Sequence, residues 1–200
     1  VEIKGEGEQA QKVAVALAAV LAVAGFEGWK YYQRTEAEKA SVVYLEAVQK
    51  AGDGKFDDAL AALAAVKHAG FKQLGKLREA AVLAEKGDTA KAVAAYDVVI
   101  ADAATDPVLA DLARIRQGYL LVDTATPDEL LLKLRTFDAE GNPWRHAARE
   151  IFALSAFRVK DFTMADRFAN QIYADAEAPQ SIKQRAQVMV QLIAPELVKK

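Results

Sequence analysis

The chain has 200 residues and a mass of 21.6 kDa, enough for one domain with its own core and an appendage. Hydrophobic residues make up 52% of it but aromatic residues only 8%, a balance that favours closely packed helices over sheets. The net charge is −2 and Lys and Arg form no dense cluster, so the composition argues against a nucleic-acid partner. The absence of cysteine excludes disulfides, thiolate metal sites and thiol nucleophiles.

The N-terminal stretch divides into a polar and an apolar part. Residues 1–11 combine two glycines and mixed charges without an apolar face, and they predict a flexible tail. An uninterrupted apolar run of 14 residues follows, from Val13 to Phe26. As a helix it would be about 21 Å long, shorter than the ~30 Å hydrocarbon core of a bilayer. Extension to Tyr32 brings the helix to 20 residues and ends it in aromatic and basic side chains typical of a membrane interface.

Three interpretations compete for this apolar helix, whose segment we place at residues 12–34. A signal peptide would end in small residues at a cleavage site, but Phe26-Glu27-Gly28-Trp29 continues the helical pattern. A buried helix of a soluble domain fits the modest length and the many alanines. A single-pass anchor that crosses the membrane with residues 13–32 is the interpretation we favour. The charges on either side do not determine its orientation.

Residues 35–198 show the pattern of amphipathic helices arranged in pairs. The first pair is separated from the second by an expected break at Gly70, and His68 is expected near a helix C-terminus, where its charge would be favourable. The expected pairs are Glu36–Ala51 with Phe56–His68, Phe71–Lys86 with Asp88–Ala104, Pro107–Val122 with a helix opening at Thr126-Pro127, and Trp144–Val159 with Phe162–Ala176. A last helix, from Ser181 to about Ile193, has no partner and is typical of a terminal cap.

Several helix starts are marked by capping residues. Asp88 is a predicted N-cap, and Asp106 precedes a proline at the first helical position. Thr126 and Glu129 have the spacing of a capping box. These local signals predict where three of the helices begin.

Small residues recur in the paired helices at a fixed spacing. Ala47, Ala80, Gly118 and Ala153 lie in the first helices, and twelve positions later in the second helices stand Ala59, Ala92, Leu130 and Ala165. Successive units are 33, 38 and 35 residues apart, near the ~34-residue period of tetratricopeptide repeats. The sequence therefore predicts an all-α fold: a tetratricopeptide-like solenoid of about four helical hairpins plus a C-terminal capping helix, preceded by an N-terminal apolar helix.

Nearly the whole chain, from about residue 13, also resembles one known family. The N-terminal helix ends in Gly28-Trp29-Lys30-Tyr31-Tyr32, and the later segments are REAAVLAEKGDTAKAVAAYD, DLARIRQGYLLVDTATPDEL and NPWRHAAREIFALSAFRVKD. Together they resemble the alphaproteobacterial tetratricopeptide-like proteins related to the ancillary subunit of the SecYEG translocon. The resemblance implies a single-pass protein of the bacterial inner membrane, with the N-terminus cytoplasmic and the helical domain periplasmic. It implies translocon subunits, periplasmic chaperones or client segments as partners.

The first helix of each pair supplies one candidate binding surface. If the hairpins stack as in tetratricopeptide arrays, these helices line a concave, apolar face that could receive an apolar or amphipathic segment. The alternative is that the same apolar stripe is core. The residues placed on this face are Tyr44, Val48, Leu74, Leu77, Leu112, Ile115, Tyr119, Leu154 and Phe157.

A second candidate lies where the fourth pair begins. Trp144, Arg145 and Arg149 gather at a helix N-terminus and could hold a carboxylate or a partner loop. Alternatively, Trp144 fills a gap between repeats and Arg149 pairs with a nearby acid. His146 and Glu150 are four residues apart, but without a third ligand a helical salt bridge is favoured over a metal site.

No motif for phosphate binding, nucleophilic catalysis or zinc binding occurs, and we expect no cofactor and no enzymatic activity. The favoured hypothesis is an interaction scaffold anchored in the inner membrane. The alternative is a soluble structural or assembly subunit whose N-terminal helix packs on its own domain or mediates self-association into a homo-oligomer. Extraction at high pH separates the two, because a spanning helix stays with the membrane.

Overall fold

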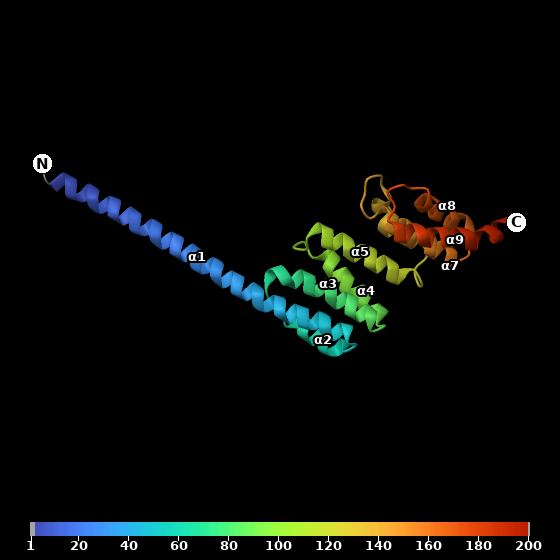
Figure 1. Ribbon diagram of the computed structural model, residues 1–200, viewed down its shortest axis with the longest axis horizontal. Helices are drawn as coiled ribbons and strands as arrows, with labels where there is room; N and C mark the ends of the chain where they lie inside the picture. The colour runs from blue at the N-terminus through green and yellow to red at the C-terminus, as the bar shows by residue number, and fades with distance from the viewer. Residues whose placement is uncertain (1–2, 200) are drawn as a thin grey trace. The chain divides into compact units, whose positions relative to one another are not determined.

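The computed structural model describes residues 3–199, and all regular structure in that range is helical (Figure 1). The chain divides into two compact units, residues 1–75 and residues 76–200. The helices are α1 (Ile3–Gly52), α2 (Phe56–Ala64), α3 (Ala69–Glu85), α4 (Thr89–Ala101), α5 (Pro107–Leu121), α6 (Pro127–Leu134), the short 3-10 helix η1 (Arg135–Asp138), α7 (Arg145–Arg158), α8 (Phe162–Tyr173) and α9 (Gln180–Val198). The predicted fold class, four helical hairpins with a terminal helix after an apolar N-terminal helix, is confirmed.

The first unit is dominated by α1, an unbroken helix of 50 residues (Figure 1). The predicted tail differs from the structure, because residues 3–11 already belong to α1, while residues 1–2 lie outside the described range. Residues 6–12 are mostly Glu, Gln, Ala and Lys, all good helix formers, and an isolated glycine costs only about 1 kcal/mol in a helix. The predicted boundaries at residues 12 and 35 are likewise crossed without a break.

One helix among the described residues is long and apolar enough to cross a membrane, and it is α1 between Gln11 and Gly52. Its apolar window has a mean hydropathy of 1.6, and none of that window is buried. All residues from Gln11 to Arg34 are exposed, including the bulky Leu21, Phe26 and Trp29.

The C-terminal part of α1 forms the first hairpin with α2. The chain reverses at Gly54, whose φ of +77° is a conformation that glycine adopts without strain. α2 ends at Ala64, earlier than predicted, and α3 begins at Ala69, so Gly70 lies in the first turn of a helix rather than at a break. His68 accordingly precedes the N-terminus of α3: its carbonyl accepts hydrogen bonds from the Phe71 and Lys72 amides, and its Nδ1 accepts one from the Gly70 amide at 3.2 Å.

The second unit begins within α3 and contains the helices from α4 to α9, and its capping residues act as predicted. The Asp88 side chain accepts a hydrogen bond from the Lys91 amide, and Asp106 accepts one from the Val108 amide. Both halves of the Thr126 and Glu129 capping box are formed. α9 continues through Pro195 to Val198, beyond its predicted end near Ile193, and Pro195 supplies no amide hydrogen, so one helical hydrogen bond is missing there.

The small residues with twelve-residue spacing lie at buried helix crossings in both units. All eight positions are buried, which confirms that the repeat marks the contact of each hairpin. Gly118 leaves room for Leu134 and Ile151, since a Cβ at position 118 would lie 2.8 Å from Leu134 Cδ1 and 2.9 Å from Ile151 Cδ1. The largest core cluster centres on α7, where the Phe152 and Phe168 rings are 5.0 Å apart.

Candidate functional site

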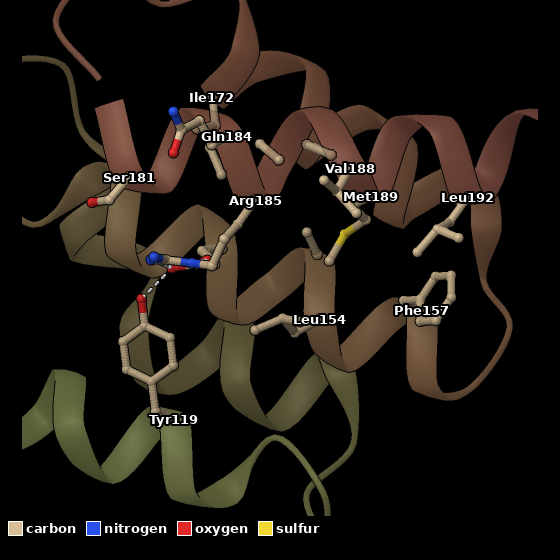
Figure 2. A pocket seen from close by; sticks show the side chains of 14 residues that line it. Tyr119, Leu154, Phe157, Ile172, Ser181, Gln184, Arg185, Val188, Met189 and Leu192 are labelled. Carbon is tan, nitrogen blue, oxygen red and sulfur yellow. Dashed lines mark hydrogen bonds and ion pairs between the residues drawn. The ribbon is translucent and has the colours of Figure 1, made fainter. Parts of the chain in front are cut away.

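The second unit carries an open groove of about 780 Å³ formed by α5, α7, α8 and α9 (Figure 2). Its helices α5 and α7 are first members of their hairpins, and α9 is the helix that follows the last hairpin. The lining residues are Tyr119, Glu150, Ala153, Leu154, Phe157, Ala169, Ile172, Ser181, Gln184, Arg185, Ala186, Val188, Met189 and Leu192.

Most of the groove is apolar. Buried Ala153 and Ala169 contribute to the lining, and their small side chains leave room between the helices. Figure 2 shows Leu192 of α9 facing Phe157 of α7 across the groove. Val188 and Leu192 expose 55% and 59% of their surface, so the α9 wall presents bulky apolar side chains to solvent. Such exposure is unfavourable in water and favourable in contact with an apolar partner.

One end of the groove is a polar cluster of three side chains. The Tyr119 hydroxyl donates to Glu150 Oε2 at 2.6 Å, and Arg185 Nη2 donates to the same oxygen at 2.8 Å. Arg185 Nε donates to the other oxygen, Oε1. The Glu150 side chain is only 6% exposed, whereas Arg185 keeps 56% of its side chain in solvent. The buried carboxylate is therefore compensated by a cation at the rim.

The cluster perturbs the acid–base properties of its members. Burial, followed by the hydrogen bond to the Glu150 carboxylate, raises the pKa of the Tyr119 hydroxyl well above its usual range. The hydrogen bonds to Glu150 raise the pKa of Arg185. Tyr119 is thus neutral and Arg185 charged at neutral pH, an arrangement suited to holding a polar end of a ligand and not to proton transfer.

The structure brings three of the predicted site residues together in this groove: Tyr119, Leu154 and Phe157. The other residues predicted for the concave face do not line this groove. Leu77 and Ile115 are 5% and 3% exposed and belong to core clusters of the second unit. Tyr44 lies in the first unit, half-buried, with its ring 6.1 Å from that of Phe71.

The predicted cluster of Trp144, Arg145 and Arg149 lies at the start of α7, where acidic residues surround it. Trp144 packs against the core centred on Phe152. The guanidinium of Arg145 is 2.8 Å from Asp175 and 2.9 Å from Glu177, and it is almost fully buried. Arg149 pairs with Asp138 and lies 3.8 Å from Asp175. Both arginines thus form ion pairs within the chain.

Asp175 is the centre of this acidic and basic cluster. Its carboxylate accepts hydrogen bonds from Arg145 and from the Glu177 amide, and it also contacts His146 Nε2 at 3.0 Å. These contacts, with Arg145 the largest, lower the pKa of Asp175 below its usual range. His146 and Glu150 therefore find separate partners instead of the expected helical salt bridge with each other.

Sequence reasoning missed the Glu150–Arg185 pair and the contribution of α9. The two residues are 35 positions apart, and only the packing of α9 beside α7 reveals the contact. The amphipathic pattern of the last helix was the available signal, but it indicates a cap as readily as a groove wall. Within residues 3–199 the structure shows no group of three His, Asp or Glu side chains that could hold a metal ion.

Comparison with known proteins gives a family match. A family model described as a tetratricopeptide repeat-like domain matches residues 9–151, from within α1 to the middle of α7. No curated protein and no solved structure matches the chain. The matched range includes Tyr119 and Glu150 of the groove, whereas α8 and α9 lie beyond it.

Proposed function

We propose a function on the premise that the chain belongs to the tetratricopeptide repeat-like domain family, whose domains are generally non-enzymatic scaffolds that bind proteins. In our proposal the groove of the second unit receives a segment of a protein partner, and α1 holds the chain in a membrane. The observation that carries the proposal is the exposed apolar wall of α9 opposite Leu154 and Phe157.

The chemistry of the groove favours an amphipathic segment as its occupant. Apolar side chains of the partner would cover Val188 and Leu192, which gains free energy in proportion to the area removed from water. The polar cluster at one end would meet a polar or acidic side chain, because Arg185 remains over half exposed. This is the helix-in-groove mode of recognition.

The properties of α1 support its proposed role as an anchor, with residues 12–34 as the membrane segment and residues 35–198 as the helical domain. The aromatic rings of Phe26 and Trp29 stack 6.3 Å apart, next to the exposed Tyr31 and Tyr32. Glu27 pairs with Lys30 at 3.2 Å, which reduces the cost of a carboxylate near the hydrocarbon boundary. Aromatic and basic residues at one end of an apolar helix are typical of a membrane interface.

The resemblance to translocon-associated proteins suggests a more specific assignment. We propose a location in the bacterial inner membrane, with the helical domain in the periplasm and translocon subunits, chaperones or client segments as partners. The alternative is self-association into a homo-oligomer, and an interaction experiment must distinguish a second copy of this chain from these partners.

Photo-crosslinking tests the groove. A photoreactive residue placed at Val188 should capture a protein partner in native membranes, and the same residue placed at Val98 is a matched control, because both positions are 55% exposed in the second unit. Adducts to another protein at Val188 alone support the proposal. Equal adducts at both positions, or adducts only to a second copy of this chain, contradict it.

Carbonate extraction tests the anchor. Leu21→Arg places a charge in the middle of the apolar segment and should release the protein from the membrane pellet, because an arginine at the bilayer centre costs about 2.5–3.5 kcal/mol on insertion scales. Leu132→Arg is the control, since Leu132 is 68% exposed and Leu21 is 71% exposed. If the two variants are extracted equally, the anchor proposal fails.

A further inference from the structure

A second hollow, of about 380 Å³, lies in the first unit between α1 and the connection that follows α2. It lies wholly within residues 1–75 and is separate from the groove. Its lining residues are Tyr32, Gln33, Glu36, Lys39, Ala40, Val43, Ala65, Val66, Lys67 and His68.

The position of this hollow follows from α1. Tyr32 ends the apolar segment of residues 13–32 and also lines the hollow. α1 continues past it, reverses at Gly54, and α2 returns alongside, so residues 65–68 lie at the end of the hairpin nearest the apolar segment. The headgroup layer on each side of a bilayer is about 5–8 Å thick, the rise of about three to five helical residues. If residues 13–32 span the hydrocarbon, the near edge of the hollow therefore lies among lipid headgroups.

The chemistry of the hollow suits an anion. Glu36 and Lys39 pair at 2.7 Å, so their charges offset each other. Lys67 is exposed and forms no ion pair with another residue of the described range. His68 Nδ1 accepts the Gly70 amide hydrogen, which leaves Nε2 as the protonated, donating nitrogen of the ring. Tyr32 and Gln33 also line the hollow, and each side chain carries a hydrogen-bond donor.

We propose that this hollow binds the phosphate of an anionic phospholipid, with Lys67 and His68 as the main contacts. The inference rests on the proposed anchoring by α1, which would hold the hollow at the lipid surface. A lipid fits better than free phosphate because Ala40, Val43 and Val66 form an apolar wall beside the donors, and because a lysine near an anionic membrane surface contributes about 1 kcal/mol.

Lipid titration of the full chain in detergent, read by native mass spectrometry, tests the proposal. Wild type should retain phosphatidylglycerol in preference to phosphatidylcholine. Lys67→Gln should lower that preference about fivefold, the equivalent of about 1 kcal/mol, and Lys67→Gln with His68→Gln should lower it further. Lys55→Gln is the matched control, because Lys55 is exposed in the same unit but lies at the opposite end of the hairpin. Circular dichroism confirms that each variant is folded.

Three results would overturn the inference: no preference in wild type, an equal loss with Lys55→Gln, or full competition by millimolar inorganic phosphate, which would identify a free anion as the ligand. A separate measurement tests the anchor: whether the chain stays in membranes of neutral lipid after a carbonate wash. A chain that is retained there but shows no lipid preference refutes the headgroup site alone. A chain that is released from every membrane refutes the proposed anchoring instead.

Discussion

The apolar segment of α1 and the helix α7 are both rich in alanine, yet their environments are opposite. From Gln11 to Arg34 all residues of α1 are exposed, whereas nine of the 14 residues of α7 are buried. The polar side chains His146 and Glu150 of α7 contact Asp175, Tyr119 and Arg185 through hydrogen bonds. The α1 run of residues 13–26 has no polar side chain to turn toward water. The apolar content of a helix thus determines how much of its surface is unfavourable in water. The positions of its polar residues determine whether packing within the chain can bury that surface.

The strongest test of this contrast removes a large side chain from the α7 core. Phe152→Ala should lower the free energy of unfolding by about 3–5 kcal/mol, because Phe152 is fully buried against Phe168. Urea unfolding in a mild non-ionic detergent measures it in a Trp29→Phe background, where Trp144 is the only tryptophan and reports on this core. A loss under about 1 kcal/mol would mean that the packing around α7 is loose.

The next largest effect is expected at the ion pair between Glu150 of α7 and Arg185 of α9, and it differs between the two residues. Arg185→Met should cost about 2–3 kcal/mol, because it leaves the buried Glu150 carboxylate with Tyr119 as its remaining side-chain donor. Glu150→Gln should cost only about 1 kcal/mol, since Arg185 can be solvated at the rim. The same fluorescence assay measures both. If Glu150→Gln is the more destabilising change, the carboxylate is not the buried member of the pair.

A smaller effect, which is present at neutral pH and lost in acid, is expected at Asp175. The pKa of Asp175 is lowered in the folded state, so the stabilisation it gives is complete above its unfolded pKa of about 3.9 and is lost as the pH falls through the lower folded value. Wild type should therefore be more stable than Asp175→Asn at neutral pH, and the difference should shrink below about pH 4. Thermal unfolding between pH 7 and pH 2 checks this. A difference that does not change with pH would assign the contribution of Asp175 to packing.

The smallest effect is expected on α1. Leu21→Ala should change the free energy of unfolding reported by Trp144 by less than about 0.5 kcal/mol, because Leu21 is 71% exposed and contributes nothing to the core. A loss comparable to that of Phe152→Ala would show that the apolar segment packs on the helical domain. That result would revive the alternative of a soluble subunit with a buried N-terminal helix.

Local signals were sufficient to predict most of the fold. The caps at Asp88, Asp106 and Thr126 depend on neighbouring residues only, so the sequence states them directly. The small residues at the crossings were predictable because close helix approach requires them, and at Gly118 even a Cβ would collide with Leu134 and Ile151. The predicted break at Gly70 was wrong for a local reason. α3 starts one residue earlier, at Ala69, and the His68 side chain accepts the Gly70 amide hydrogen at its N-terminus.

The candidate site was only partly predictable. Tyr119, Leu154 and Phe157 share a face by helical spacing alone, and the structure places them in one groove. Leu77 and Ile115 have the same spacing but meet a neighbouring helix, which periodicity cannot reveal. The partner of Glu150 lies on α9, 35 residues away, and no short motif connects them. Contacts over that separation depend on how hairpins stack.

The continuity of α1 has a mechanical consequence. Because no turn or proline interrupts it between the apolar segment and Gly52, the number of intervening residues fixes the direction in which the first hairpin points. Each residue added after Arg34 would rotate the hairpin by about 100° around the helix axis and raise it by about 1.5 Å. Seven added residues would restore the original direction to within about 20° while lifting the hairpin about 10 Å. The number of residues in α1 after the apolar segment therefore sets both the direction of the first hairpin around the helix axis and its height along that axis.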